Sequence, residues 1–274
     1  MNSKNIVITG GTDGIGLAIV KNLLKENNKI FIIGNNSKKG NDVIKTLNSQ
    51  NIEFYQCNLL ERNEIEKLVK ELSKLNQIDR LINNAGALFL KRDVNSSGIE
   101  KTFALNHLSY FHLSLSLLEK LELSDDGRII NVASNAHKRY DLDLNDLENK
   151  KNYNSWKAYC RSKLLNILFT YAFKSKINSK VTCNCLHPGF VNSNFGNNNK
   201  SLFRYAINIL KQTLAISTNK GSLTAVHLCN SLEVSGISGK YFYKCKPKKS
   251  SELSYDSNLA NLVWKESLKY LEKK

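Results

Sequence analysis

Three glycines near the start of the chain have a spacing that could bind a phosphate group. The segment IVITGGTDGIG places them at Gly10, Gly14 and Gly16, between an apolar run typical of a buried strand and a helix-like run. Glycine adopts positive φ and lets the backbone approach a pyrophosphate at a helix N-terminus. A purely structural turn is the alternative. The order of strand, glycine turn and helix favours nucleotide binding.

The spacing TGxxxGIG resembles the glycine motif of the short-chain dehydrogenase/reductase family, and it differs from the common G-x-G-x-x-G fingerprint. Within that family, the segments AYCRSKLLNILFT, LHPGFV and SGKYFYKCK and the late Trp264 are similar to the retinol dehydrogenase-like subgroup. The resemblance covers nearly the entire chain. It implies a Rossmann fold, an NAD(P) cofactor and a Tyr-x-x-x-Lys motif further along the sequence.

The Tyr-x-x-x-Lys pattern occurs three times, at Tyr153 and Lys157, at Tyr159 and Lys163, and at Tyr270 and Lys274. Tyr153 lies in a polar stretch that predicts a loop, and we expect Tyr270 to lie on a solvated helix face near the end of the chain. Tyr159 begins a strongly apolar helical segment. Because residues i and i+4 share one helix face, Lys163 would follow Tyr159 by one turn.

Tyrosine and lysine together could supply the proton for carbonyl reduction. The alkoxide that forms needs a proton, and a phenol has an ordinary pKa near 10. We expect the Lys163 ammonium to bring the pKa of Tyr159 toward neutrality, where general acid–base catalysis works best. Ser134 follows a strand and would polarise the same oxygen from the carboxyl edge of the sheet. A lone serine here could instead be a helix cap, but the glycine turn and Tyr159 favour a site.

Three further segments match the family pattern. INNAG at 82–86 ends the fourth strand candidate and would support the sheet and the cofactor. FALNHLSYF places Asn106 inside an apolar helix, where an amide needs a partner, and its counterpart in the family holds a water in a proton relay. HPGFVNS at 187–193 would meet the nicotinamide carboxamide.

The resemblance therefore implies one catalytic set: Asn106, Ser134, Tyr159 and Lys163. It implies cofactor contacts from a larger set: Gly10, Thr12, Asp13, Gly14, Ile15, Gly16, Asn35, Lys38, Asn58, Leu59, Asn84, Ala85, Gly86, Tyr159, Lys163, Pro188, Gly189, Val191 and Ser193. No metal site is expected.

Two cofactor positions depart from the pattern. Asn35 stands where the subgroup usually has an arginine for the NADP 2′-phosphate and where NAD enzymes have an acid for the ribose. Lys38 and Lys39 follow it and supply positive charge, with no acid in this stretch to repel a phosphate. We therefore expect NADP, with NAD as the alternative. Asn58 replaces an aspartate that commonly binds adenine, and its carbonyl can still accept a hydrogen bond.

Short apolar runs alternate with helical patterns along the whole chain. Strands are predicted at 6–9, 30–33, 53–57, 80–83, 128–132, 181–186 and 240–243. Helices are predicted at 15–27, 39–50, 62–75, 98–121, 156–176, 201–215 and 220–231. This alternation predicts an α/β fold with a doubly wound, seven-stranded parallel sheet. No linker interrupts it, so residues 1–274 form one expected NAD(P)-binding domain.

Composition limits the partners and the cellular location that we expect for the protein. The net charge of +16 would suit nucleic acid, but the basic residues are scattered and no interleaved aromatic motif accompanies them, so no nucleic-acid partner is expected. The six cysteines form no C-x-x-C pair, which indicates reduced thiols in the cytoplasm. No apolar run is long enough to span a membrane, and a first strand at residue 6 leaves no room for a signal peptide.

The substrate is the least determined part. The apolar residues of 201–215 could form a lipophilic lid, a membrane-facing stripe or an ordinary packed helix. With the resemblance, we expect an NADP(H)-dependent oxidoreductase that interconverts a lipophilic alcohol and carbonyl, such as a retinoid, a fatty aldehyde or a sterol-like ketone. A catalytically idle nucleotide-binding sensor or scaffold is the alternative. Peripheral contact with an internal membrane and oligomer formation stay open.

Overall fold

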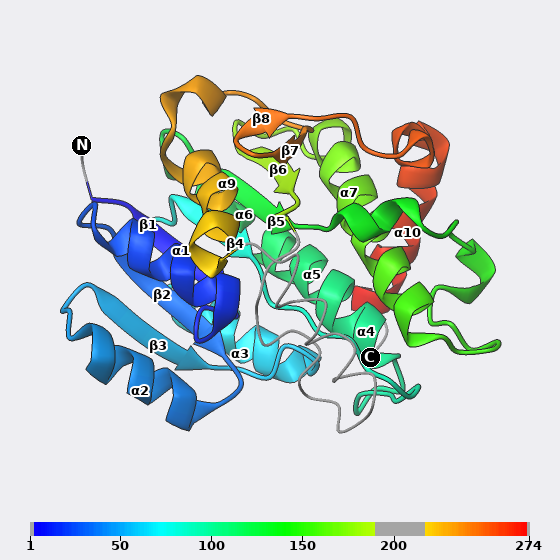
Figure 1. The fold of residues 1–274 in the computed structure, drawn as a ribbon, viewed down its shortest axis with the longest axis horizontal. Coiled ribbons are helices and arrows are strands. Elements are labelled where there is room, and N and C mark those ends of the chain that lie inside the picture. Colours follow the sequence, from blue (N-terminus) through cyan, green and yellow to red (C-terminus); the bar gives the residue numbers. More distant parts are fainter. Residues whose placement is uncertain (1–2, 190–216, 273–274) are drawn as a thin grey trace.

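The computed structural model describes residues 3–189 and 217–272, and a single sheet runs through it with helices on both faces (Figure 1). The strands follow the order β3-β2-β1-β4-β5-β6-β7-β8, and only the β7–β8 pair is antiparallel. Their bounds are β1 Asn5–Thr9, β2 Lys29–Gly34, β3 Ile52–Gln56, β4 Arg80–Asn83, β5 Arg128–Val132, β6 Thr182–Leu186, β7 Tyr241–Tyr243 and β8 Lys246–Pro247.

Helices connect most of these strands. The α-helices are α1 Gly14–Leu24, α2 Ser37–Leu47, α3 Arg62–Leu72, α4 Lys101–Phe103, α5 Ser109–Ser116, α6 Leu118–Glu122, α7 Ser155–Lys176, α9 Thr218–Asn230 and α10 Ser257–Glu272. A π-helical turn, Ala104–Leu108, joins α4 to α5. Short 3-10 helices lie at Asn135–Lys138, Leu144–Asp146, Leu232–Val234 and Glu252–Tyr255.

The central strands are buried on both faces because successive side chains point to opposite sides of a sheet. Ile6, Ile8 and Ile32 pack on one side with the apolar residues of α1 and α9. Val7 and Phe31 pack on the other side with those of α3, α5, α7 and α10. Continuous apolar strands therefore form the middle layer between two helical layers.

The strand order reverses direction between β1 and β4. The chain moves from β1 outward to β3, and then returns to β4 on the other side of β1. Ligands of such sheets bind at the carboxyl ends of the strands at this point. The segments that follow Thr9 and Asn83 meet there, and they contain the glycine turn and INNAG.

Two arginines at the amino ends of the strands, opposite the glycine turn, hold the end of α9. Arg80 and Arg128 are partners in the register of β4 and β5. Arg80 donates to the carbonyl of Cys229 at 2.6 Å, and Arg128 donates to that of Leu228 at 2.9 Å. Asp126 forms ion pairs with both guanidinium groups. The last carbonyls of α9 are thus satisfied by buried cations, which suits the negative end of the helix dipole.

The seven predicted strands are present with bounds shifted by at most a residue or two, and the short β8 adds an antiparallel edge. The single helix predicted over 98–121 is wrong, because it divides into α4, the π-helical turn, α5 and α6. The helix α10 contains Tyr270, for which a helical position was expected, but its bounds were not predicted. The helix expected over 201–215 falls outside the described residues.

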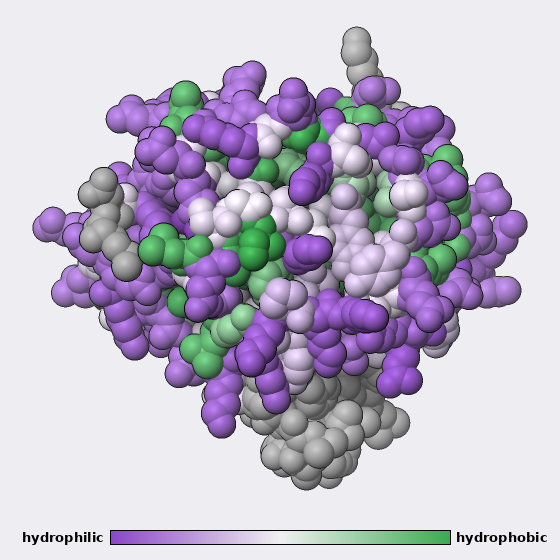
Figure 2. Space-filling view, turned by 90° about the horizontal axis from the view of Figure 1, so that it is seen from above, coloured by the Kyte–Doolittle hydropathy of each residue, from purple (hydrophilic) through white to green (hydrophobic). Residues whose placement is uncertain are grey.

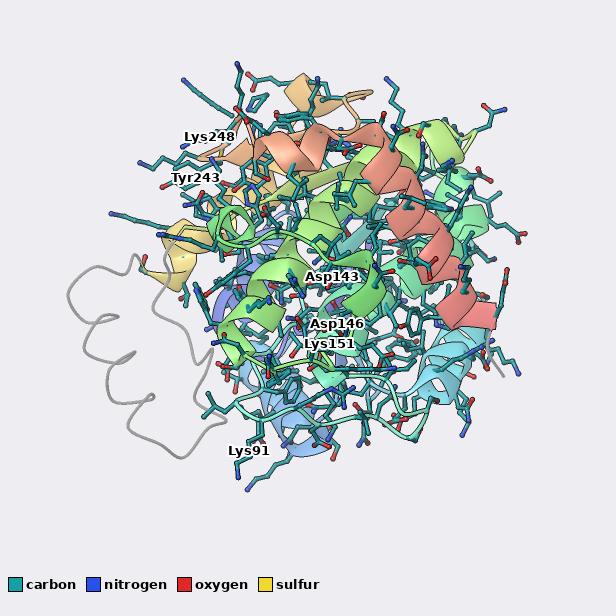
Figure 3. The ribbon with its side chains drawn as sticks, turned by 90° about the vertical axis from the view of Figure 1, so that its right-hand side faces the viewer. Lys91, Asp143, Asp146, Lys151, Tyr243 and Lys248 are labelled. Atoms are coloured by element: carbon teal, nitrogen blue, oxygen red, sulfur yellow. The ribbon has the colours of Figure 1, made fainter. Side chains whose placement is uncertain are left out.

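Segments beyond the sheet also pack on α7. The loop that carries Asp143, Asp146 and Lys151 crosses the outer side of this helix (Figure 3), and Arg161 of α7 donates to the backbone carbonyl of Asp141 at 2.9 Å. Hydrophilic residues cover most of the face seen in Figure 2, with apolar residues in small groups between them. Among the described residues, no helix is both long and apolar enough to span a bilayer.

Candidate active site

The glycine turn has a backbone that larger residues could not adopt. Gly10 and Gly14 have φ of 66° and 54°. A Cβ atom at Gly16 would lie 2.1 Å from the carbonyl oxygen of Gly10 and 2.6 Å from the side-chain amide nitrogen of Asn84. The first turn of α1 therefore packs directly on the loop, and its backbone stays accessible to a phosphate.

Thr9 and Asn84 fasten this turn to the end of β4. The Asn84 side chain donates to the carbonyl oxygens of Thr9 and Gly10, at 2.9 and 3.2 Å. The Thr9 hydroxyl accepts from the backbone N–H groups of Asn84 and Ala85, at 2.9 and 3.0 Å. INNAG thus supports the glycine turn. Thr9 was absent from the predicted site, although it opens the TGxxxGIG motif.

An acidic side chain lies beside the predicted phosphate position. Asp13 accepts from the N–H of Gly14 at 2.7 Å and forms an ion pair with Lys39 at 3.2 Å. The stretch around Lys38 and Lys39 has no acid of its own, as the sequence shows, but the fold brings Asp13 of the glycine turn to Lys39. Asn35 is exposed, and its backbone carbonyl accepts a long bond of 3.5 Å from Gln56.

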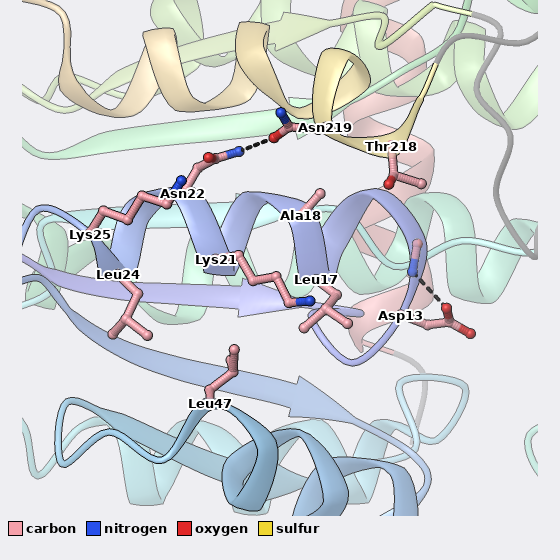
Figure 4. A pocket seen from close by; sticks show the side chains of 11 residues that line it. Asp13, Leu17, Ala18, Lys21, Asn22, Leu24, Lys25, Leu47, Thr218 and Asn219 are labelled. Carbon is pink, nitrogen blue, oxygen red and sulfur yellow. Dashed lines mark hydrogen bonds between the residues drawn. The ribbon is translucent and has the colours of Figure 1, made fainter.

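A groove of about 820 Å³ runs from this turn along the outer side of α1 (Figure 4). Its lining includes Asp13 and Lys21 from the start and the body of α1, Leu47 from the end of α2 and Asn219 from the start of α9. None of the four candidate catalytic residues lines this groove. It adjoins the cofactor turn and is separate from the position where a carbonyl would react.

Asn58, the predicted adenine contact after β3, already forms hydrogen bonds within its own segment. The side-chain oxygen of Asn58 accepts from the N–H of Leu60 at 3.2 Å, and the Asn58 N–H donates to Glu64 at 2.6 Å. An amide oxygen has two lone pairs, so one stays available for a ligand. Leu59 is buried.

Tyr159 and Ser134 meet at the carboxyl edge of the sheet. Tyr159 lies in the first turns of α7 and is 9% exposed, packed with Leu88, Ala136 and Cys160. Burial raises the pKa of Tyr159 to about 12, and its hydrogen bond with Ser134 partly opposes that rise. The expected shift toward neutrality is therefore wrong for the chain alone, because loss of solvent outweighs the stabilisation of phenolate.

Lys163 lies one turn beyond Tyr159 and is almost fully buried. Its ammonium donates to the carbonyl oxygen of Val132 at 3.0 Å and lies 5.6 Å from the centre of the Tyr159 ring. Burial lowers the pKa of Lys163 to about 7. A Cβ atom at Gly86 would lie 3.4 Å from this ammonium and 3.2 Å from the Asn106 side-chain oxygen. Glycine at 86 therefore leaves room for both side chains.

Asn106 lies on the π-helical turn, an irregularity that is often found at functional sites. Its side chain accepts from the N–H of Ala87 and donates to the Ala87 carbonyl, both at 2.9 Å, and it reaches Ser162 at 3.1 Å. The backbone carbonyl of Asn106 accepts from the side-chain amide of Asn166 at 2.8 Å. The buried amide thus has the partners it needs, and it ties the segment after β4 to α7.

His137 fixes the backbone next to Ser134. Its Nε2 accepts from the N–H of Ser251 at 3.0 Å, which leaves Nδ1 as the donor to the Ser134 carbonyl at 2.7 Å. The hydroxyl of Ser134 also caps the 3-10 helix through the N–H of Ala136 at 3.2 Å. His137 was missed from the sequence, where only its place three residues after Ser134 could have indicated it.

The two other tyrosines of the repeated pattern have structural partners. Tyr153 lies in a loop, as predicted, and donates to the carbonyl of Phe89 at 2.8 Å. Tyr270 donates to Glu148 at 3.0 Å and packs on Phe103 at 5.1 Å between ring centres. The expected solvated position of Tyr270 is wrong, because α10 packs this face inward.

The last predicted contacts follow β6. His187 precedes Pro188, and its Nδ1 accepts from the N–H of Gly189 at 3.0 Å. Its ring stacks on Tyr243 with ring centres 4.4 Å apart. The Lys248 ammonium lies over the Tyr243 ring, 4.9 Å from its centre (Figure 3). Val191 and Ser193 lie outside the described residues.

Within residues 3–189 and 217–272, no three His, Cys, Asp or Glu side chains are arranged to hold a metal ion. All six cysteines are free thiols, as predicted.

Known proteins with similar sequences and structures agree with this architecture. A sequence model described as short chain dehydrogenase matches residues 4–202. Human polyprenol dehydrogenase is 32% identical over 95% of the chain and 83% of its own length, and human retinol dehydrogenase 14 is 29% identical over 96% and 85%. A crystal structure of an uncharacterized protein from Mycobacterium paratuberculosis has a TM-score of 0.79, with 22% identity over 99% of the chain and 94% of its own.

Proposed function

The chain belongs to the short-chain dehydrogenase family, an oxidoreductase family that uses a nicotinamide nucleotide, and we propose that it interconverts a lipophilic alcohol and its carbonyl compound with NADP(H). The observation that carries the proposal is the contact between the buried Tyr159 hydroxyl and Ser134, one helical turn from the Lys163 ammonium. A phenol beside a hydroxyl and a cation can bind and protonate one oxygen atom.

In the proposed reduction, NADPH, when bound, supplies the hydride that adds to the carbonyl carbon. Ser134 and Tyr159 donate hydrogen bonds to the carbonyl oxygen, and the proton of Tyr159 moves to that oxygen as the alkoxide forms. Lys163 stabilises the phenolate that is left, and a proton from solvent then restores the phenol. The raised pKa of Tyr159 keeps its proton in place before this step.

The cofactor proposal rests on the glycine turn and on the charges at the start of α2. The turn packs so closely at Gly16 that no side chain fits there, and a turn of this kind lets a pyrophosphate approach the backbone at a helix N-terminus. Lys38 and Lys39 favour a 2′-phosphate, and the ion pair of Lys39 with Asp13 reduces that preference. We expect NADPH to bind more tightly than NADH in a fluorescence titration, by a margin that salt diminishes.

The substrate proposal follows the relatives and the apolar contacts of Tyr159. Two relatives are named for a polyprenol and for retinol, both long apolar alcohols. In this chain Tyr159 belongs to an apolar cluster with Leu88 and Ala136, and Leu90 packs against that cluster. A panel of aldehydes and ketones tests the class, and turnover of small polar carbonyls alone would contradict it. We place the protein in the cytoplasm, which the six free thiols support.

The decisive experiment removes one oxygen atom. Tyr159→Phe should lower kcat by about a hundredfold or more, because proton transfer by a positioned side chain contributes that much. It should leave NADPH affinity within a few-fold of wild type, since the glycine turn is untouched. Tyr153→Phe is the matched control, as its hydroxyl bonds the Phe89 carbonyl elsewhere. Equal turnover of wild type and Tyr159→Phe would exclude the mechanism, whereas no turnover by the wild type would favour a scaffold or sensor.

A further inference from the structure

An exposed tryptophan lies directly on the ring of Tyr159. The rings of Trp156 and Tyr159 are nearly parallel, with an interplanar angle of 22° and centres 5.6 Å apart. Aromatic rings at this separation attract one another when they are stacked with an offset. Trp156 is 40% exposed and Tyr159 only 9% exposed, so the indole has open surface next to a covered phenol.

The position of Trp156 is fixed by the start of α7. The side chain of Asn154 caps the helix by accepting from the N–H of Lys157 at 2.9 Å. Trp156 therefore belongs to the first helical turn, three residues before Tyr159, and the two side chains share one face. The indole is thus held by the helix and by the stack, and a ligand would meet a rigid surface.

The apolar neighbours of the Tyr159 ring differ in their exposure. Leu88 and Ala136 contact it as buried aliphatic groups, with little area left for a ligand. Trp156 is the exposed large apolar side chain in contact with it. A carbonyl oxygen within hydrogen-bond reach of Tyr159 and Ser134 places its carbon substituents near this ring. Those substituents then lie within reach of the indole.

We propose that Trp156 is an aromatic wall of the substrate site, and that it selects carbonyl compounds in which the reacting group is attached to a flat conjugated or aromatic group. This inference rests on the proposed function. A flat group can stack on the indole with favourable ring–ring geometry, whereas a saturated group of equal size gains only the burial of apolar area.

The test compares benzaldehyde with cyclohexanecarbaldehyde, which have the same number of carbon atoms, in the presence of NADPH. The measured quantity is the ratio of their kcat/KM values, so that a general loss of activity cancels. Trp156→Leu keeps an apolar side chain and removes the ring, and it should lower the ratio about three- to tenfold. Trp156→Phe keeps a ring and should hold the ratio within about twofold of wild type.

Tyr255→Leu is the matched control. Tyr255 is an exposed aromatic residue that stacks on Tyr171, a residue of the same helix α7, with ring centres 5.4 Å apart. Its removal should leave the ratio unchanged. An equal fall of both kcat/KM values in Trp156→Leu, or no change in either, would overturn the inference and leave the proposed function standing. Failure of the wild type to reduce any carbonyl with either nicotinamide nucleotide would overturn both.

Discussion

At the scale of single residues, burial moves the pKa values of the two candidate proton-transfer side chains apart. It raises that of Tyr159 to about 12 and lowers that of Lys163 to about 7. Both shifts favour the neutral form of the group. Near neutral pH, the phenol thus carries its proton, and about half of the Lys163 side chains carry theirs.

Lys163 should make stability depend on pH. Its pKa is about 7 in the folded chain and 10.5 in an ordinary lysine, so the unfolded state binds more protons between these values and stability rises with pH. Lys163→Met removes this dependence. Urea unfolding should show the wild type gaining about 2 kcal/mol relative to Lys163→Met between pH 7 and 9. Parallel curves for the two proteins would contradict the burial of this charge.

The sequence distinguished Tyr159 from two other tyrosines because only Tyr159 begins an apolar helix. The candidate catalytic set, in contrast, came from the family resemblance, since single asparagines and serines have many structural roles. Asn166 and His137 illustrate the limit. Each bonds the backbone of a candidate site residue. Asn166 reaches Asn106 from 60 residues away, and His137 lies near Ser134 in sequence but is bonded by Ser251, 114 residues further on, which no local pattern encodes.

At the scale of elements, the anchoring of α9 depends on a small buried ionic group. Arg80 and Arg128 are each 2% exposed, and Asp126 forms an ion pair with each of them. The three charges lie where β4 and β5 begin, so one cluster links two strands to the end of a helix. Buried cations without their partner are strongly destabilising.

Asp126→Asn should therefore lower the free energy of unfolding by about 2–3 kcal/mol. The value is below that of a fully buried pair because the Asp126 side chain is 32% exposed. Its neighbour Asp125 is exposed, and Asp125→Asn is the control for loss of one negative charge. Chemical denaturation at pH 7 measures both. Equal stabilities of the two variants would show that the cluster does not hold α9.

The elements themselves were largely predictable, and the exceptions have local causes. Continuous apolar runs identified all strands except β8, which has only Lys246–Pro247 and exists through pairing with β7. The helix over 98–121 was expected to be regular. It changes its winding at Ala104–Leu108, where Asn106 bonds to Ala87 and Asn166. Those partners come from other elements, so the segment alone does not reveal the π-helical turn.

At the scale of the whole molecule, buried neutral histidines make the fold sensitive to acid. Burial lowers the pKa of both His107 and His187 to about 4. His107 lies in the core between helices, bonded to Ser267 of α10 at 2.9 Å and facing Asn166 of α7 at 3.3 Å. Protonation would place a cation among groups that cannot solvate it.

Stability should fall as the pH drops from about 6.5 to 4, because the unfolded state then binds protons that the folded state excludes. For His107 this loss is about 3 kcal/mol. His107→Gln should be less stable than wild type at pH 7 and should lose correspondingly less between pH 7 and 4. Urea midpoints followed by circular dichroism measure this. An identical pH dependence in both proteins would exclude His107 as the sensitive group.

The bond from the Ser251 N–H to His137 has a consequence for synthesis of the protein. The glycine turn, INNAG and Tyr159 all precede Ser251 in the chain, so they leave the ribosome before it does. The backbone at Ser134 gains the support of His137 and Ser251 only after residue 251 has emerged. Because a domain generally folds as a unit, we expect the candidate site to take its final geometry only when synthesis is nearly complete.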